Sequence, residues 1–297
     1  MAVMNETGYT YAVARIRANE LGLLSAADME QLLSAPDLAA AESVLSARGY
    51  AMGLGLEAAL HAKTAETWQL IAEILPQPGE LDFLIVRNDF HNLKARLKAM
   101  FTQGAPRAPL LFPTVFDDSE IGALLEAKQF GGLPACMAGC GCEIYELLAR
   151  TMDGQLADAA IDRQCLETIL SMANVTGSDF LKGLAQKMCA FANAKIALRG
   201  EKTGKDRAFL DRALCNCPPA EIPQEARQSA AAFEKYCDDA LIEYALPAKW
   251  KHFGVEPVAA YWLAREAEIK NVRIVMTCRQ NDVPAEEIRK RVRLLYV

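Results

Sequence analysis

The side chains that could hold a metal ion or act as nucleophiles are nine cysteines and three histidines. The densest group is Cys136, Cys140 and Cys142, and its C-x-x-x-C-x-C spacing differs from the paired spacing of zinc sites. The histidines stand far from this group in the sequence, at positions 61, 91 and 252. We therefore expect reduced thiols that pack as small apolar side chains, with no metal and no cofactor. A thiol- or metal-dependent enzyme centred on these cysteines is an alternative that the spacing does not favour.

Residues 200–206, GEKTGKD, have the glycines and the lysine of a phosphate-binding P-loop. One residue too few separates the two glycines, however, and Asp206 stands where a P-loop has the Ser or Thr that binds magnesium. The sequence contains neither the G-x-S-x-G motif of a serine hydrolase nor the H-E-x-x-H motif of a metalloprotease. We therefore predict no catalytic residues and no small-molecule substrate.

Another set of polar residues recurs at three places along the chain. Residues 90–98, 191–199 and 269–276 align on a column of asparagines, and a cation follows each asparagine two positions later. The columns contain Asn92, Asn193 and Asn271, and Lys94, Lys195 and Arg273. We predict that each asparagine bonds a neighbouring backbone and each cation pairs with an acid, so that the columns hold three modules in register. The alternative is that both columns are solvated polar faces.

These columns must lie on helices, because the apolar columns around them are 7, 3 and 4 residues apart, the spacing of one helical face. The chain is also 52% hydrophobic but only 7% aromatic, and it is rich in Ala, Leu and Glu, which favour helices. We predict an all-α protein of three similar helical modules in tandem: residues 1–112, 113–216 and 217–297. Proline-rich crossings at 104–113 and 215–223 separate the modules.

Local signals predict where several helices begin and end. Ser25 and Asp28 form a capping-box pattern at the start of a helix, and Gly49 is placed to end the next one. A single helix is expected over residues 224–246. We also predict a terminal helix over residues 285–296, whose acidic first turn and basic last turn complement the helix dipole. Membrane or nucleic-acid binding by its basic residues is a minor alternative.

The charge and hydropathy of the chain argue against several classes of protein. The net charge of −6 and the pI of about 5.3 argue against a general nucleic-acid binder, since such domains are usually basic. Residues 1–10 lack the pattern of a secretory signal. The longest uncharged run, 129–142, is shorter than the roughly 18–20 apolar residues that a membrane span needs. If this protein works at a membrane, we expect a partner to hold it there.

Four stretches of the chain resemble one protein family. They are YAVARIRA at 11–18, DFHNLKARLK at 89–98, E-P-x-x-A-Y-x-x-A-x-E-x-E-x-K-N-x-R-I at 256–274, and the end of the chain from Pro284 to LLYV. Together they resemble the C subunit of prokaryotic V/A-type rotary ATPases, which is the counterpart of the d subunit in vacuolar ATPases. The resemblance covers essentially the whole chain. It is most specific in the last forty residues and least specific in the cysteine-containing middle.

The resemblance implies a funnel of three helical modules about a pseudo-threefold axis. It also implies a non-catalytic rotor component in the central stalk of an ATPase or ATP synthase. Such a component links the membrane proteolipid c-ring to the central axle, the D subunit together with the F subunit, and transmits torque for proton or sodium transport. The expected location is the cytoplasmic face of the membrane, where partner subunits hold the protein peripherally. The alternative is a helical adaptor or scaffold protein of a soluble complex.

Overall fold

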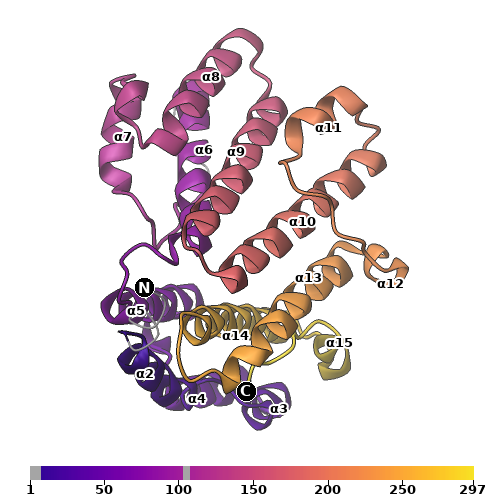
Figure 1. The fold of residues 1–297 in the computed structure, drawn as a ribbon. Coiled ribbons are helices and arrows are strands. Elements are labelled where there is room, and N and C mark those ends of the chain that lie inside the picture. Colours follow the sequence, from indigo (N-terminus) through magenta and orange to yellow (C-terminus); the bar gives the residue numbers. More distant parts are fainter. Residues whose placement is uncertain (1–7, 103–107) are drawn as a thin grey trace. The chain divides into compact units, whose positions relative to one another are not determined.

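The computed structural model describes residues 8–102 and 108–297, and every regular element in these two stretches is a helix (Figure 1). The prediction of an all-α protein is therefore confirmed. The chain forms two compact units. Unit 1 comprises Met1–Pro78 and Ile222–Val297, and unit 2 comprises Gly79–Glu221. Most of residues 1–10, which we compared with a secretory signal, and part of the first predicted crossing lie outside the described residues.

Unit 1 is organised around the long helix α14, Glu256–Gln280, which packs against helices from both ends of the chain. Buried residues lie on every side of this helix, as expected for a core helix. The other α-helices of the unit are α2 (Thr10–Glu20), α3 (Ala26–Ser34), α4 (Leu38–Ala47), α5 (Leu56–Ile74), α12 (Gln224–Arg227), α13 (Ala230–Ala245) and α15 (Ala285–Arg289). Two short 3-10 helices, η1 (Met52–Leu54) and η4 (Leu246–Trp250), join them.

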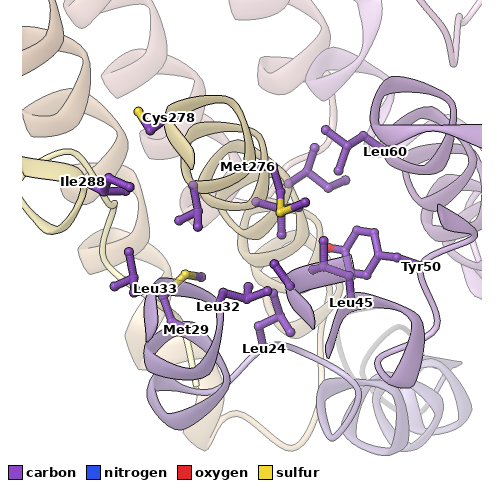
Figure 2. Close-up of a cluster of buried hydrophobic side chains, with 14 residues drawn as sticks. Leu24, Met29, Leu32, Leu33, Leu45, Tyr50, Leu60, Met276, Cys278 and Ile288 are labelled. Atoms are coloured by element: carbon purple, nitrogen blue, oxygen red, sulfur yellow. The ribbon is translucent and has the colours of Figure 1, made fainter. Parts of the chain in front are cut away.

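The C-terminal half of α14 faces a cluster of apolar side chains from α3, α4 and α5 (Figure 2). Met276 of α14 lies among Leu32, Leu45 and Leu60, all of which are fully buried. Burial of such side chains is worth about 1.5–3 kcal/mol each, so this cluster accounts for much of the stability of unit 1.

Unit 2 is organised around α9, Gly154–Val175, which contacts four other α-helices of the unit. Those four are α6 (Val86–Thr102), α8 (Ala135–Thr151), α10 (Asp179–Lys202) and α11 (Arg207–Ala213). The remaining elements are α7 (Asp118–Glu126), η2 (Asp82–Leu84) and η3 (Phe130–Gly132).

Two of the local signals act as predicted. The Ser25 hydroxyl accepts a hydrogen bond from the Asp28 amide, and the Asp28 carboxylate accepts one from the Ser25 amide, which completes the capping box. Gly49 has a φ of +79°, a left-handed conformation in which a side chain would be strained, and α4 ends just before it.

Three boundaries differ from the predictions. The single helix expected over 224–246 is broken, because the Ser229 hydroxyl accepts the Ala232 amide and starts the new helix α13. Helix α11, capped by Asp206, was not predicted. The terminal helix ends at Arg289 rather than at residue 296, so the predicted dipole pairing of its last turn is wrong beyond that point.

The compact units and the predicted tandem modules divide the chain at different places, and the module boundaries at 112 and 216 stay predictions. All nine cysteines are free thiols, and those at 136, 140 and 142 are half-buried. Within residues 8–102 and 108–297, no group of three metal-binding side chains is arranged to hold an ion. In the same stretches, no helix is long and apolar enough to cross a bilayer.

Candidate functional site: three asparagine clamps

Asn92 lies buried in the middle of α6 and holds a segment that returns along this helix. Its Nδ2 donates to the Leu111 carbonyl at 3.0 Å, and its Oδ1 accepts the Leu111 amide at 2.8 Å. One turn earlier on α6, the buried Asp89 carboxylate accepts the amides of Val115 and Phe116, each at 2.9 Å. The backbone after α6 is therefore fixed to the helix by two neighbouring polar side chains.

Asn193 occupies the same kind of position in α10 and is fully buried. Its Oδ1 accepts the Cys215 amide at 3.2 Å. Its Nδ2 donates to the carbonyls of Cys215 and Cys217, at 3.1 and 2.5 Å. The segment that follows α11 is thus bound to the middle of α10.

Asn271 repeats the arrangement in α14, where it is also fully buried. Its Nδ2 donates to the Arg293 carbonyl at 3.1 Å, and its Oδ1 accepts the Arg293 amide at 2.7 Å. The chain is held further because Leu294 donates its amide to Asp239 Oδ1 at 2.6 Å. These bonds explain why the terminal helix stops early: the backbone of residues 293–294 is bonded to Asn271 and Asp239 instead of forming another helical turn.

We call each of these arrangements an asparagine clamp: a buried mid-helix asparagine that bonds both backbone groups of one residue downstream. The clamped residue follows its asparagine by 19 residues in α6 and by 22 residues in α10 and α14. A carboxamide carries a donor and an acceptor side by side, as a peptide group does, and so it can pair with both groups of one residue. Two clamps lie in unit 2 and one in unit 1.

Lys94 and Arg273 of the basic column form ion pairs with carboxylates on other helices. Lys94 Nζ lies 2.6 Å from Asp162 Oδ1 on α9. Arg273 forms a two-fold hydrogen bond with the Glu57 carboxylate at 2.9 and 3.0 Å, and this bond lowers the pKa of Glu57. Lys195 is exposed. Partly exposed pairs of this kind contribute at most about 1 kcal/mol each, so the asparagines matter more to stability than the cations.

Each of the three predicted asparagines forms a clamp of its own within a single unit. Each clamp is occupied by the protein's own backbone, so its amide is not available to a ligand. The arrangement therefore fixes helices and return segments, and it offers no chemistry of its own. That the clamps keep three modules in register stays a proposal.

A buried ionic network on α14 was missed by the sequence analysis. Arg265 and Glu268 are 4% and 2% exposed, and the Arg265 guanidinium bonds the Glu268 carboxylate. The other bonds of this carboxylate come from the Leu24 amide and the Tyr50 hydroxyl, both at 2.5 Å. Burial and the adjacent Glu268 charge raise the pKa of Tyr50, so its hydroxyl stays a donor. The available signal was an Arg and a Glu three positions apart, but Glu266 and Lys270 on the same helix look alike in the sequence, so the pair did not stand out.

The Asp89 carboxylate predicts a pH dependence of stability in unit 2. Burial raises its pKa to about 6, although the amides of Val115 and Phe116 act in the opposite direction. A folded-state pKa above the ordinary value of 3.8 means that its stabilising contribution is complete below pH 3.8 and is lost as the pH rises through 6.

We therefore expect the free energy of unfolding of the wild type to fall relative to Asp89→Asn between pH 4 and 7. The expected change is up to roughly 3 kcal/mol, the value of a two-unit shift. Urea unfolding of both proteins at each pH measures this difference, because the other titrating groups are common to both. A difference that does not vary with pH would show that the two amides hold the carboxylate ionised throughout.

The fold and the clamps define a class of protein. The molecule is an all-helical framework whose buried polar side chains bind its own backbone, as suits a structural subunit. Comparison with known families agrees with this class. The profile of the ATP synthase (C/AC39) subunit family matches residues 12–218 and 208–291, and the chain belongs to that family.

Curated relatives extend the match over nearly the full length. The chain is 22% identical to the C subunit of the V-type sodium ATPase of Enterococcus hirae, with 95% of this chain and 97% of the relative aligned. It is 21% identical to the C subunit of the A-type ATP synthase of Methanocaldococcus jannaschii, with 97% and 86% aligned. It is 24% identical to the C subunit of the A-type ATP synthase of Haloferax volcanii, with 94% and 95% aligned.

Proposed function

We propose that this chain is the central-stalk rotor component of a V/A-type ATPase or ATP synthase. It joins the membrane proteolipid c-ring to the central axle, the D subunit together with the F subunit, and transmits torque between them for proton or sodium transport. The observation that carries the proposal is the family match over residues 12–218 and 208–291, together with relatives that are named as C subunits of such complexes. The protein has no catalytic step of its own and works at the cytoplasmic face of the membrane through its partners.

The asparagine clamps support this role physically. A part that carries torque must resist shear between its helices, and close packing with satisfied buried polar groups makes an interior stiff. Each clamp ties the chain that leaves a long helix back to the middle of that helix. Under load, such a helix and its return segment move together.

The composition of the complex tests the proposal directly. Membranes from cells that carry a tagged copy of the chain are extracted with detergent and analysed by native mass spectrometry. We expect one copy of the chain together with a proteolipid ring and the axle subunits. Recovery from the soluble fraction alone, without these partners, would contradict the rotor role and leave a helical adaptor or scaffold of a soluble complex.

Deleting the gene for this chain tests whether it is needed for ion transport but not for ATP hydrolysis. In membranes from a deletion strain, we expect ATP-driven ion transport to disappear while the soluble catalytic head continues to hydrolyse ATP. Restoring the wild-type chain from a plasmid should restore transport. If hydrolysis by the isolated head requires this chain, the non-catalytic assignment is wrong.

A further inference from the structure

The segment 246–256, between α13 and α14 in unit 1, presents large apolar and basic side chains to solvent. We call it the aromatic loop. Trp250 is 81% exposed and Phe253 is 50% exposed. Lys251 and His252, between these two aromatics, are exposed as well, whereas Lys249 is half-buried with its Nζ 4.9 Å from the centre of the Tyr296 ring. A single tryptophan on a surface is ordinary, but two exposed aromatics within four residues, interleaved with basic side chains, form a concentrated surface feature.

The aromatic loop has a fixed conformation at its base. The Arg17 guanidinium of α2 donates to the carbonyls of Ala248 and Lys251 at 2.7 and 2.9 Å. The same guanidinium pairs with Glu20 at 2.7 Å, which holds it in place. Ala248 and Val255 are buried at the two ends of the loop. The exposed aromatics are therefore displayed by an anchored turn.

One further large apolar side chain, Leu21, is exposed near the anchor. Leu21 follows Arg17 by one helical turn, so it lies on the same side of α2, and it is 81% exposed. The basic character of the aromatic loop is local, because the whole chain carries a net charge of −6. Glu256 is the one acidic residue in the segment, and it stands at its last position.

We infer that the aromatic loop docks on a bilayer surface that contains anionic lipid. Tryptophan is favoured at the depth of the lipid headgroups, where its ring is partly apolar and its N–H remains hydrated. Lysines beside such a ring place their charge at the phosphate level while their methylene stems stay apolar. An anionic surface repels the acidic remainder of the chain, so the molecule would meet it through this loop.

The inference can be tested without the proposed rotor function, because the binding experiment uses only the isolated chain and vesicles. If the rotor role also holds, the contact would add a direct membrane attachment to those made through partner subunits. A protein partner with an acidic, apolar recess is the competing occupant, and it predicts no binding to vesicles.

Fluorescence quenching by brominated lipid locates the contact. The chain has three tryptophans, and two of them, Trp68 and Trp262, pack edge to face with their ring centroids 5.0 Å apart. Trp262 is buried and Trp68 is half-buried, whereas Trp250 is 81% exposed, so Trp250 is the tryptophan best placed to reach a bilayer. With vesicles of brominated phosphatidylcholine and phosphatidylglycerol, we expect quenching in the wild type and its loss in Trp250→Phe. Absence of quenching in the wild type, or equal quenching in both proteins, would overturn the inference.

Sedimentation with unbrominated vesicles measures the affinity. Lys251→Gln should weaken binding to anionic vesicles roughly fivefold, the usual contribution of one lysine near an anionic surface. Trp250→Ser combined with Phe253→Ser should abolish binding. Leu54→Ser is the matched control, because Leu54 is 84% exposed in the same unit but lies outside the loop. Equal weakening by Leu54→Ser would contradict the assignment to the aromatic loop.

Discussion

Replacing Glu268 by alanine is expected to lower the free energy of unfolding of unit 1 by roughly 3–5 kcal/mol, the usual effect of removing one partner of a buried ion pair. The Arg265 guanidinium would remain buried without its counter-charge. The Leu24 amide and the Tyr50 hydroxyl would also lose their acceptor. Leu24 and Tyr50 lie in the N-terminal segment and Arg265 lies on α14. The loss therefore weakens the contact between these two parts of unit 1.

The charge and the hydrogen bonds of Glu268 can be separated by two further variants. Glu268→Gln keeps the shape and one acceptor oxygen but removes the charge, so Arg265 still loses its counter-charge. Combining Arg265→Met with Glu268→Leu removes both charges and fills the space with apolar atoms. We expect the double variant to be less destabilised than the sum of its single variants, because neither residue then leaves an unpaired charge.

Tryptophan fluorescence during urea unfolding is the appropriate measurement, because Trp68, Trp250 and Trp262 all lie in unit 1. Glu57→Ala is the matched control: Glu57 also pairs with an arginine of α14, but the Arg273–Glu57 pair is largely exposed. Its loss should change the stability by less than about 1 kcal/mol. If Glu268→Ala costs no more than Glu57→Ala, the buried network is not a principal source of stability.

Sequence analysis predicted some of the structure that depends on neighbouring residues and missed the rest. The capping box at Ser25 and Asp28 and the turn at Gly49 are complete within four residues, and both were predicted. Helix α11 was missed because seven residues after a glycine-rich turn carry little periodic signal. The break before Ser229 was missed because a run of alanines favours a continuous helix.

Contacts with distant parts of the chain explain two further errors, the length of the terminal helix and the burial of Glu268. The residues after Arg289 have ordinary helix propensity, but Asn271 and Asp239 bind their backbone from distant parts of the chain. The burial of Glu268 was equally hidden, because Glu266, two positions earlier on α14, looks the same in the sequence but is only half-buried. Sequence periodicity indicates which residues face inward, but it does not identify the segment that meets them.

For the asparagine column, sequence analysis predicted the shared role of the three residues but not the segments that they bind. Aligning three helices on Asn92, Asn193 and Asn271 predicted that these residues share a role. The segments that they hold have no common motif: the clamped residues are a leucine, a cysteine and an arginine. An asparagine bonds the backbone of the clamped residue, so the identity of that side chain is unconstrained and leaves no signal to align.

Alanine at Asn271 is expected to lower the free energy of unfolding of unit 1 by roughly 2–4 kcal/mol, since it leaves both backbone groups of Arg293 without partners in a buried place. Asn281→Ala is the control, because the exposed Asn281 bonds only the Thr277 carbonyl within its own helix. Hydrogen exchange at the Arg293 amide should accelerate in Asn271→Ala and remain slow in Asn281→Ala.

The same substitution at Asn92 and Asn193 should release Leu111 and Cys215 while the Arg293 amide remains protected, because these clamps lie in unit 2. A triple alanine variant tests the proposed role of the clamps in transmitting torque. It should lose thermal stability and weaken binding to the axle subunits, because each return segment would no longer move with its helix. If both thermal stability and axle binding are unchanged, the asparagine columns have no structural role, and torque must be carried by apolar packing alone.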